Sequence, residues 1–475
     1  MKNKVKNFSS SKRLFLKKSL SLASCGLFVS PPLFYIKKVQ SVTKKTLASS
    51  IEEYTEGKIK HTDVISAKNI SYLENLVDPS TYKEVMFENR EFLLSPSEND
   101  HETLFPPFFY QATRNNRNKL SINEQNNVVD KAGAEWTGGL PFPTTKSAKE
   151  ITYNLALGCN RHDQAVNAIN GSIIDKNGNI EQSFDMVFAS QQLSGICNPS
   201  INDSIEDKTR YKHLLKYNAV WFSEPEELKG LTFTNKWFKD QYKFPELYSF
   251  SPNTRRMTKL ANSRRLSEII PNINFSLSDA YGFGDPFGVW GNWKIVYKGP
   301  FLVSTQHNWR PDLPNWDLPI TGGLKGQSYY LVRKQYVPNI IVIDITPTGY
   351  RNPGFAKKRI YIDSRNMTPA KILYYDQSNN IIKSIEIGYS QLKINSSIQP
   401  TIRNAPILTS LKKPDWNWSW YICKNHRTKK IGRFHLAESC TGGWKTTSDN
   451  ITLNGTPDEF IEKYMTQKGI RKLFG

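Results

Sequence analysis

The sequence lacks the short motifs that mark the commonest classes of enzyme. It contains no G-x-S-x-G nucleophile elbow, no H-E-x-x-H zinc motif and no Walker phosphate loop. Three acids, Asp279, Asp285 and Asp344, are candidates for a carboxylate set, but nothing in their spacing brings them together. The residues therefore favour a protein that is not an enzyme, and a hydrolase of unknown substrate is the alternative.

Acidic residues are absent from the first fifty positions, which contain 11 Lys or Arg. The formal net charge of the whole chain is +21, so these positions leave only +10 for the rest. That excess is spread over more than 400 residues, and no basic run is interleaved with aromatics in a nucleic-acid recognition motif. We therefore expect no nucleic-acid partner, whereas anionic lipid headgroups or lipopolysaccharide fit the charge at least as well.

The basic leader continues into an apolar stretch from Ser19 to Ile36, which is the pattern of a secretory signal. Within it, Ser11–Lys17 (SKRLFLK) resembles a twin-arginine export signal in which Lys replaces the first Arg. We predict that residues 1–48 are a signal peptide or a membrane anchor. Residues 49–475 would then form a single domain in the periplasm, free or associated with the outer membrane. Lipidation at Cys25, which ends a lipobox-like LASC, stays open as an alternative.

Cysteine is scarce, with five in the chain and four after the leader. An even number in an exported chain favours disulfides, and we predict the sequence-local pairs Cys159–Cys197 and Cys423–Cys440. Each bond would stabilise the fold by about 3–4 kcal/mol. The alternative is a metal site, although its spacing is not a usual zinc pattern. Its ligands would be Cys423, His426, His435 and Cys440. We expect no metal and no cofactor.

From residue 179 onwards the pattern favours strands, without an internal repeat and without the strand–helix alternation of parallel sheets. The predicted strands are 183–190, 216–223, 301–306, 328–337, 339–346, 358–363, 371–376 and 381–389. Residues 50–130 are polar and helical in places, and Thr456–Glu459 (TPDE) predicts the start of a C-terminal helix. We predict a mostly β, α+β protein with peripheral helices and a large curved antiparallel sheet, wrapped by an N-terminal helical segment.

A central stretch, Phe244–Gly299, combines a predicted hairpin with a loop rich in glycine and aromatics. Tyr248 and Phe250 alternate with serines before the turn Ser251–Thr254 (SPNT). Four loop glycines are expected to let residues 281–290 move as a lid over a cavity. They are Gly282, Gly284, Gly288 and Gly291. In the strand that follows, one face is expected to carry Trp293, Ile295 and Tyr297.

Ten residues of this stretch fit two linked patterns, Y-x-x-x-P-x-x-R-R-x-x-R and D-x-F-x-G followed by W-x-(I/L)-V-x-K. They are Tyr248, Pro252, Arg255, Arg256, Asp285, Phe287, Trp293, Ile295, Val296 and Lys298. Lys259 stands in place of the later Arg, and Gly288 comes one position early. In these patterns the chain resembles the domain-of-unknown-function family 1329 of exported bacterial proteins. That family is similar in fold to the lipoprotein-sorting carriers LolA and LolB, which implies a curved half-barrel around an apolar pocket.

Aromatic residues supply the candidate ligand-binding set. Three indoles alternate along residues 416–420 and are expected on one strand face, as core packing or as the wall of a ligand cavity. The candidates are Tyr281, Phe283, Phe287, Trp290, Trp293, Tyr297, Trp416, Trp418 and Trp420. The candidates for contact with a charged headgroup or a partner are Arg255, Arg256, Asp285 and Arg333.

Together these features predict a carrier or accessory protein that binds a hydrophobic molecule in a half-barrel. The ligand would be a lipid, an amphiphile or a lipoprotein acyl chain. The expected partner is an envelope transporter or an outer-membrane barrel. The alternative to the carrier, besides the hydrolase, is a structural partner of an outer-membrane protein that binds no ligand.

Overall fold

The computed structural model describes residues 48–304, 314–392 and 415–474. Apart from Ala48, the predicted leader lies outside the described residues, and so does Cys25. Across these three ranges, no helix combines the length and the apolar character that crossing a membrane requires.

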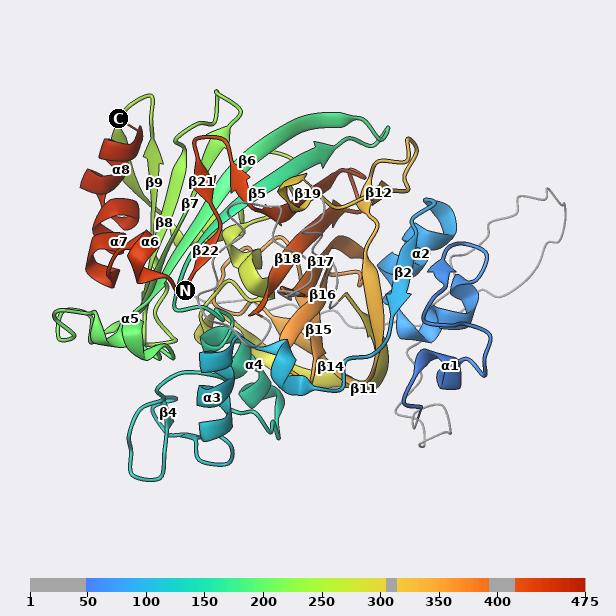
Figure 1. The fold of residues 1–475 in the computed structure, drawn as a ribbon, viewed down its shortest axis with the longest axis horizontal. Helices are drawn as coiled ribbons and strands as arrows, with labels where there is room; N and C mark the ends of the chain where they lie inside the picture. Colours follow the sequence, from blue (N-terminus) through green and yellow to red (C-terminus); the bar gives the residue numbers. More distant parts are fainter. Residues whose placement is uncertain (1–47, 305–313, 393–414, 475) are drawn as a thin grey trace, which may run out of the picture. The chain divides into compact units, whose positions relative to one another are not determined.

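The helices lie mainly near the two ends of the described chain (Figure 1). The α-helices are α1 Ile51–Tyr54, α2 Pro79–Phe87, α3 Pro107–Asn115, α4 Ala148–Leu157, α5 Pro199–Asp203, α6 Ile451–Asn454, α7 Pro457–Met465 and α8 Gln467–Phe474. The 3-10 helices are η2 Ile70–Leu76, η3 His101–Leu104, η4 Asn262–Leu266, η5 Leu277–Gly282, η6 Phe287–Val289 and η7 Pro314–Trp316.

Most strands belong to one large sheet. Its strands are β1 Val64–Ile65, β2 Phe92–Ser95, β5 Gln164–Ile174, β6 Ile180–Gln192, β7 Leu214–Glu224, β8 Thr232–Phe238, β9 Glu246–Ser251, β10 Arg256–Leu260, β11 Gly291–Val303, β14 Arg333–Thr346, β15 Lys357–Asp363, β16 Thr368–Tyr375, β17 Ile381–Leu392, β18 Asp415–Asn425, β19 Ile431–Ala437 and β22 Thr447–Ser448. The small pairs are β3 Ser121–Ile122 with β4 Val128–Val129, β12 Ile320–Thr321 with β13 Tyr329–Tyr330, and β20 Ser439–Cys440 with β21 Trp444–Lys445.

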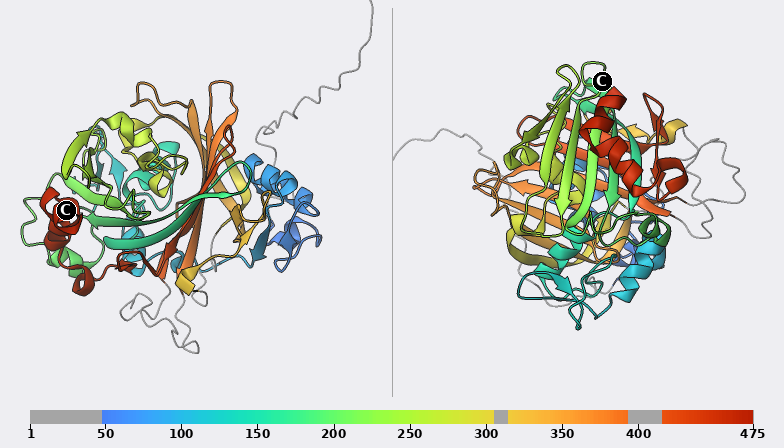
Figure 2. Two further views of the ribbon diagram at one scale, coloured as in Figure 1. Left: turned by 90° about the horizontal axis from the view of Figure 1, so that it is seen from above. Right: turned by 90° about the vertical axis from the view of Figure 1, so that its left-hand side faces the viewer.

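The large sheet consists of two meanders joined side by side. Its order is β1-β2-β14-β15-β16-β17-β18-β19-β5-β6-β7-β8-β9-β10, with β11 beside β14 and β22 beside β5. Every pair is antiparallel except β2 with β14. The meanders meet where β19 pairs with β5, and the sheet bends strongly in the view from above (Figure 2). The prediction of a mostly β, α+β protein with a large curved antiparallel sheet is confirmed.

One predicted strand break is absent. Residues 328–337 and 339–346 were expected as separate strands because Pro338 lies between them, but β14 continues through this proline. The pairing of β14 with β11 shifts register here, between Gly299 and Phe301. Pro338 is exposed at this irregular position, which is where a sheet tolerates a residue without an N–H group.

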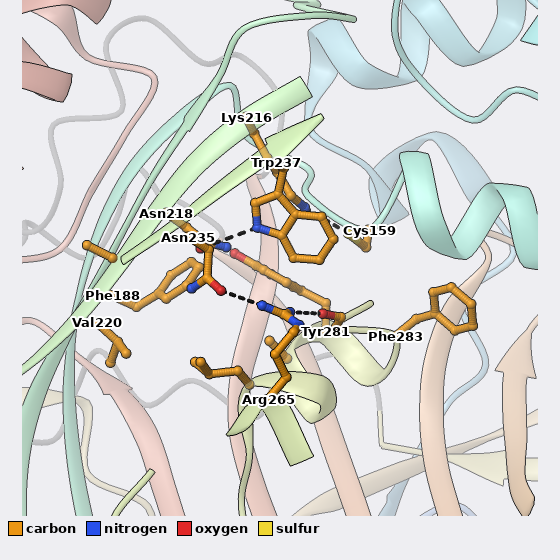
Figure 3. Close-up of a pocket in the computed structure, with 14 residues that line it drawn as sticks. Cys159, Phe188, Lys216, Asn218, Val220, Asn235, Trp237, Arg265, Tyr281 and Phe283 are labelled. Atoms are coloured by element: carbon orange, nitrogen blue, oxygen red, sulfur yellow. Dashed lines mark hydrogen bonds between the residues drawn. The ribbon is translucent and has the colours of Figure 1, made fainter. Parts of the chain in front are cut away.

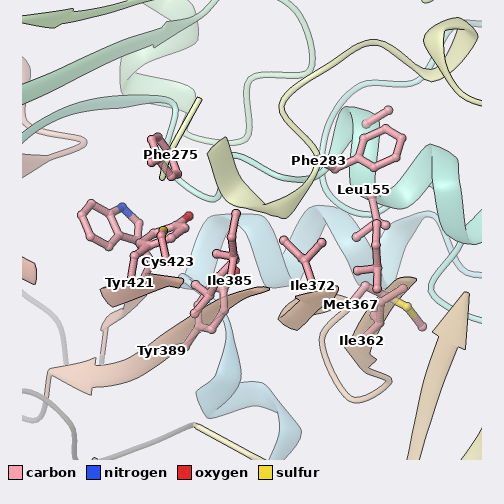
Figure 4. Close-up of a cluster of buried hydrophobic side chains, with 14 of the residues drawn as sticks. Leu155, Phe275, Phe283, Ile362, Met367, Ile372, Ile385, Tyr389, Tyr421 and Cys423 are labelled. Carbon is pink, nitrogen blue, oxygen red and sulfur yellow. The ribbon is translucent and has the colours of Figure 1, made fainter. Parts of the chain in front are cut away.

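Both faces of the sheet are covered by other parts of the chain. We call the face that carries Trp418 and Tyr421 the inner face. It packs against α3, α4 and residues 262–290, and Figure 4 shows part of this core. The opposite, outer face packs against residues 48–94 and against α7. Thr456 and Glu459 form the capping box that starts α7, so the predicted C-terminal helix is confirmed.

Two β-bulges change which side chains share a face. In β18 the pairing shifts between Gly388–Trp420 and Tyr389–Trp418, so Trp418 faces inward while Trp420 packs on the outer face. A similar shift in β11 places Tyr297 on the outer face, opposite Trp293. The expectation that each aromatic row shares one face is therefore wrong, because a bulge adds one residue and reverses the alternation.

The glycine-rich segment is packed rather than free to move as the sequence suggested. A Cβ on Gly284 would lie 2.1 Å from the Leu277 carbonyl oxygen. A Cβ on Gly288 would lie 2.9 Å from the Gln241 carbonyl oxygen. Phe287 and Trp290 are buried in the core of the inner face. These glycines allow close approach of backbone segments, so the interpretation of residues 281–290 as a glycine-hinged lid is not supported.

Candidate functional site

An apolar cavity of about 50 Å³ lies against the inner face of the sheet. We call it the apolar chamber. From the strands it is lined by Ile169, Met186, Phe188, Val220, Trp418, Tyr421 and Phe434. Its other wall is residues 262–284, which we call the cover segment and which supplies Ile269, Phe275, Leu277, Ala280 and Tyr281. Because β5–β7 and β18–β19 meet in mid-sheet, both meanders contribute to one site.

Half of the residues that line the chamber are aromatic. The rings of Tyr421 and Phe434 stack at 4.9 Å, and Phe275 meets each of them edge to face at 5.5 and 5.1 Å. Tyr281 meets Phe188 edge to face at 5.8 Å, so this pair joins the cover segment to β6. The backbone N–H of Tyr281 donates to the Tyr421 hydroxyl at 3.1 Å, which ties the cover segment to β18.

A smaller cavity of about 20 Å³, lined partly by charged and polar side chains, adjoins the chamber, and we call it the lysine end (Figure 3). Both cavities are lined by Phe188, Val220, Leu277, Ala280 and Tyr281. The lysine end adds Lys216, whose Nζ lies 3.4 Å from Cys159 Sγ and 4.8 Å from the centre of the Trp237 ring. Arg265 also lines it, but its guanidinium is engaged by Asp285 at 2.7 Å and by Asn235.

A second cavity of about 10 Å³, the arginine end, is lined by Tyr281, Arg161 and other polar side chains. The chain reaches it because α4 stops at Gly158 and the following loop carries Cys159 and Arg161 to the start of β5. Arg161 donates to the Asn366 carbonyl oxygen at 2.8 Å, and burial lowers its pKa to about 10. Cys159 and Tyr281 line both polar ends, and Tyr281 also lines the chamber, so all three cavities converge on Tyr281.

Buried charges hold the cover segment against the sheet. Asp279 binds Lys383 at 2.6 Å and accepts a bond from the Tyr374 hydroxyl. Burial alone would raise the pKa of Asp279, but Lys383 and Lys358 lower it overall. Lys358 donates to the Ser278 carbonyl oxygen at 2.9 Å, and burial lowers its own pKa to about 8. These contacts fix the two residues that precede Ala280, which lines the chamber.

The family described as "Protein of unknown function (DUF1329)" matches residues 64–413 of the chain. The chain belongs to the DUF1329 family. Among solved structures, a DUF1329 protein from Desulfovibrio piger is 9% identical, with a TM-score of 0.40, over 64% of this chain and 92% of that one. A LolA superfamily protein from Nitrosomonas europaea is 10% identical, with a TM-score of 0.34, over 61% and 91%. No curated protein matches the chain. The family resemblance inferred from the sequence is confirmed.

In this DUF1329 chain, three of the aromatic candidates line the cavities, namely Tyr281, Phe283 and Trp418. The others lie elsewhere. Phe287 stacks between Tyr153 and Trp293. The remaining four candidates are Trp290 and Trp416 in the inner core, and Tyr297 and Trp420 on the outer face.

The four candidates for headgroup or partner contact do not form one surface on this DUF1329 protein. Arg255 and Arg256 are exposed at the β9–β10 hairpin, at one end of the sheet order. Arg333 is exposed on β14, which lies near the other end. Asp285 is buried in its ion pair with Arg265. Of these four residues, none lines the chamber or its polar ends.

The acids considered for a hydrolase are also engaged. Asp279 and Asp285 each form a buried ion pair, with Lys383 and Arg265 respectively. Asp344 binds Arg359 at 2.7 Å, and it alternates in β14 with isoleucines of the inner core. The three carboxylates therefore serve separate ion pairs rather than one shared set.

Sequence reasoning missed the residues that give the cavities their charge, Lys216 and Arg161. The available signal was modest: Lys216 starts a predicted strand that is otherwise apolar or uncharged, and Arg161 follows a run of core residues in α4. Neither pattern states whether a carboxylate lies nearby, because the partners would come from distant strands.

The predicted disulfides are absent, and the four described cysteines are free thiols. Cys423 belongs to the inner core, where it pairs across strands with Gly432. Cys440 belongs to a different cluster, under α7, and its Sγ lies 3.7 Å from Ser223 Oγ. The prediction of a Cys423–Cys440 bond is wrong for this reason. In the structure Cys159 contacts Lys216 and Cys197 contacts the Gly195 carbonyl oxygen, so the predicted Cys159–Cys197 bond is also not formed.

Within the three described ranges, no group of three or more His, Cys, Asp or Glu side chains is arranged to hold a metal ion. The alternative zinc ligands are dispersed in this DUF1329 chain. His426 bonds to Ser384 at 2.9 Å, whereas His435 bonds to Tyr330 at 3.1 Å. The apolar chamber with its two polar ends is therefore the candidate functional site of this chain.

Proposed function

We propose that this DUF1329 protein is a carrier or accessory protein that binds a hydrophobic chain in the apolar chamber. The observation that supports this function is the chamber itself, an apolar, partly aromatic cavity on the inner face of the bent sheet, bordered on one wall by the cover segment. Proteins enclose apolar ligands in cavities of this character, in which a few polar groups converge at the edge.

The chamber must widen to accept a ligand. Its volume of about 50 Å³ is small beside the roughly 300–1,000 Å³ of typical ligand pockets. Widening requires the cover segment to move away from the strands, breaking the Tyr281–Phe188 contact. Each buried methylene contributes about 0.8 kcal/mol, so a chain of eight would offset an opening cost of about 6 kcal/mol.

The leader supports a periplasmic location for the carrier. Its basic, acid-free start and apolar stretch are those of an exported protein, so we propose the periplasm, free or associated with the outer membrane. The partner would be an envelope transporter or an outer-membrane barrel. Fusing residues 1–50 to a reporter that is active only outside the cytoplasm tests export, and a silent reporter in expressing cells would contradict it.

Binding is tested with the neutral fluorescent dye N-phenyl-1-naphthylamine and the purified protein. We expect saturable binding that Ala280→Phe weakens at least about tenfold, because the new ring fills the chamber. Ala280→Ser is the matched control: it keeps the volume small and should bind as the wild type does. Both variants are first compared by thermal unfolding. A dye that fails to saturate, or that binds Ala280→Phe unchanged, would leave the structural partner as the better function.

A further inference from the structure

Lys216 differs from Lys334, Lys371 and Lys424, the deeply buried lysines of the described chain that bind carboxylates, and from Lys358, which donates to Ser278. The Lys216 side chain is only 4% exposed, yet among the described residues its Nζ meets a thiol and an indole ring and no carboxylate. By contrast, Lys334 and Lys371 each bind Glu386, and Lys424 binds Glu88. An ammonium taken out of water without a counter-charge is costly, so its presence at a cavity wall requires a reason.

Arg161 has the same property at the arginine end. It is 8% exposed, and one of its terminal nitrogens, Nη1, is buried without a hydrogen-bond partner. The other, Nη2, donates to backbone carbonyl oxygens, and the guanidinium stacks 4.6 Å from the centre of the Phe109 ring. Among described residues no carboxylate lies within ion-pair distance of Arg161. Its unused donor is therefore the kind of group that a ligand anion satisfies.

The two cations line cavities that share the same pair of side chains, Cys159 and Tyr281. Lys216 contacts Cys159 (Figure 3). Cys159 and Tyr281 line both polar ends, while Tyr281 also lines the apolar chamber. A ligand whose hydrocarbon chain lies in the chamber would thus place its own polar group beside two buried positive side chains. Arg265 does not compete for that role, because Asp285 already neutralises it.

We propose that the ligand is an anionic amphiphile whose carboxylate or phosphate binds Lys216 and Arg161, while its hydrocarbon chain occupies the apolar chamber. This inference rests on the proposed carrier function. It adds the sign of the ligand's charge and assigns the two residues that recognise it. An anion between the two ends completes the charge pairing that the described side chains leave open, and chain burial supplies the affinity.

The experiment displaces N-phenyl-1-naphthylamine with four twelve-carbon ligands below their micelle concentrations. They are dodecanoate, dodecyl phosphate, dodecanol and dodecylammonium. We expect one or both anions to displace the dye at concentrations about 30-fold or more below those of dodecanol, with dodecylammonium weakest. The two anions distinguish a carboxylate ligand from a phosphate ligand. If dodecanol and dodecylammonium displace the dye as well as both anions do, the inference is overturned.

Lys216→Met provides the second readout. It keeps an apolar stem and removes the charge, so we expect anion affinity to fall about 30-fold while dye and dodecanol binding stay unchanged. Its Tm should be equal or higher, because an unpaired buried ammonium is removed. Lys236→Met is the matched control: it lies in β8 between Asn235 and Trp237, which line the lysine end, so its own side chain points away.

The outcomes separate the two proposals. Absence of saturable dye binding rejects the carrier function itself. Dye binding together with equal affinity for charged and neutral ligands keeps the carrier and rejects the anion site. A lower Tm for Lys216→Met with unchanged anion affinity would assign Lys216 a structural role and would also reject the anion site. The comparison of the four ligands on the wild-type protein tests the anion site even where a variant does not fold.

Discussion

Glu386 is the position where the structure predicts the largest effect of a single charge. It lies in a buried ion-pair cluster between α2 and the outer face of the sheet. The cluster contains four acids and four bases: Asp78, Glu84, Glu88, Glu386, Arg90, Lys334, Lys371 and Lys424. Glu386 contacts Arg90 at 2.9 Å and Lys371 at 3.4 Å, bonds to Lys334, and accepts from Ser304 at 2.9 Å.

We predict that Glu386→Gln lowers the free energy of unfolding by about 3–5 kcal/mol. The variant keeps the side-chain shape but leaves three of the bases without their shared carboxylate, and removing one partner of a buried ion pair costs this much. That is a large part of the roughly 5–15 kcal/mol that holds a typical domain folded. The measurement is urea unfolding, in which the midpoint shifts while the slope stays constant.

Two control variants test whether this loss comes from the buried cluster. Glu227→Gln removes an exposed acid and should change stability by no more than about 0.5 kcal/mol. The double variant Glu386→Gln, Lys334→Met should lose less than the sum of the two single variants, because it removes a charge of each sign. A loss below about 1 kcal/mol for Glu386→Gln, or strictly additive effects, would refute the account of a dry, interdependent cluster.

Three further predictions follow from other parts of the structure. Burial raises the pKa of Glu84, but Lys371, Lys424 and Arg90 hold it at about 2, below its ordinary 4.5. Stability on the order of 3 kcal/mol should therefore be present above pH 4.5 and be lost as the pH falls towards 2, which acid unfolding monitored by circular dichroism measures. Gly288→Val should lower the Tm by several degrees rather than slow ligand uptake, since its Cβ would meet the backbone of residues 241–242; an unchanged Tm would contradict this. Cys423 and Cys440 should both be alkylated after unfolding without reductant, and a mass spectrum showing them linked would contradict their placement in separate clusters.

Much of the fold could be predicted because it depends on local patterns. The hairpin β9–β10, the alternation of Ile341, Ile343 and Ile345, and the capped start of α7 each follow from neighbouring residues. The mistakes about strand faces have one physical cause. A bulge adds a residue to one strand, and the sequence does not mark where the partner strand lacks one, so Trp420 and Tyr297 were assigned to the wrong face.

The candidate site was predictable only in part, since aromatics near a cavity can be guessed but charge pairing cannot. Tyr281, Phe283 and Trp418 were found because aromatic residues in strand-rich sequence tend to line an interior. Whether a cation is paired depends on partners from distant strands. Lys334 has Glu386 from β17, whereas Lys216 has only the loop residue Cys159 and Trp237 of β8.

The sequence by itself determined the fold class, the family and the supply of aromatic and basic side chains, because strand periodicity, turns and motifs are local properties of the chain. The tertiary structure alone decided the faces of the bulged strands, the free state of the four thiols, and the isolation of two buried cations beside an apolar chamber. Those features depend on which strands become neighbours. The neighbours are set by the burial of both faces of one sheet at once, and no single segment of the sequence determines that burial.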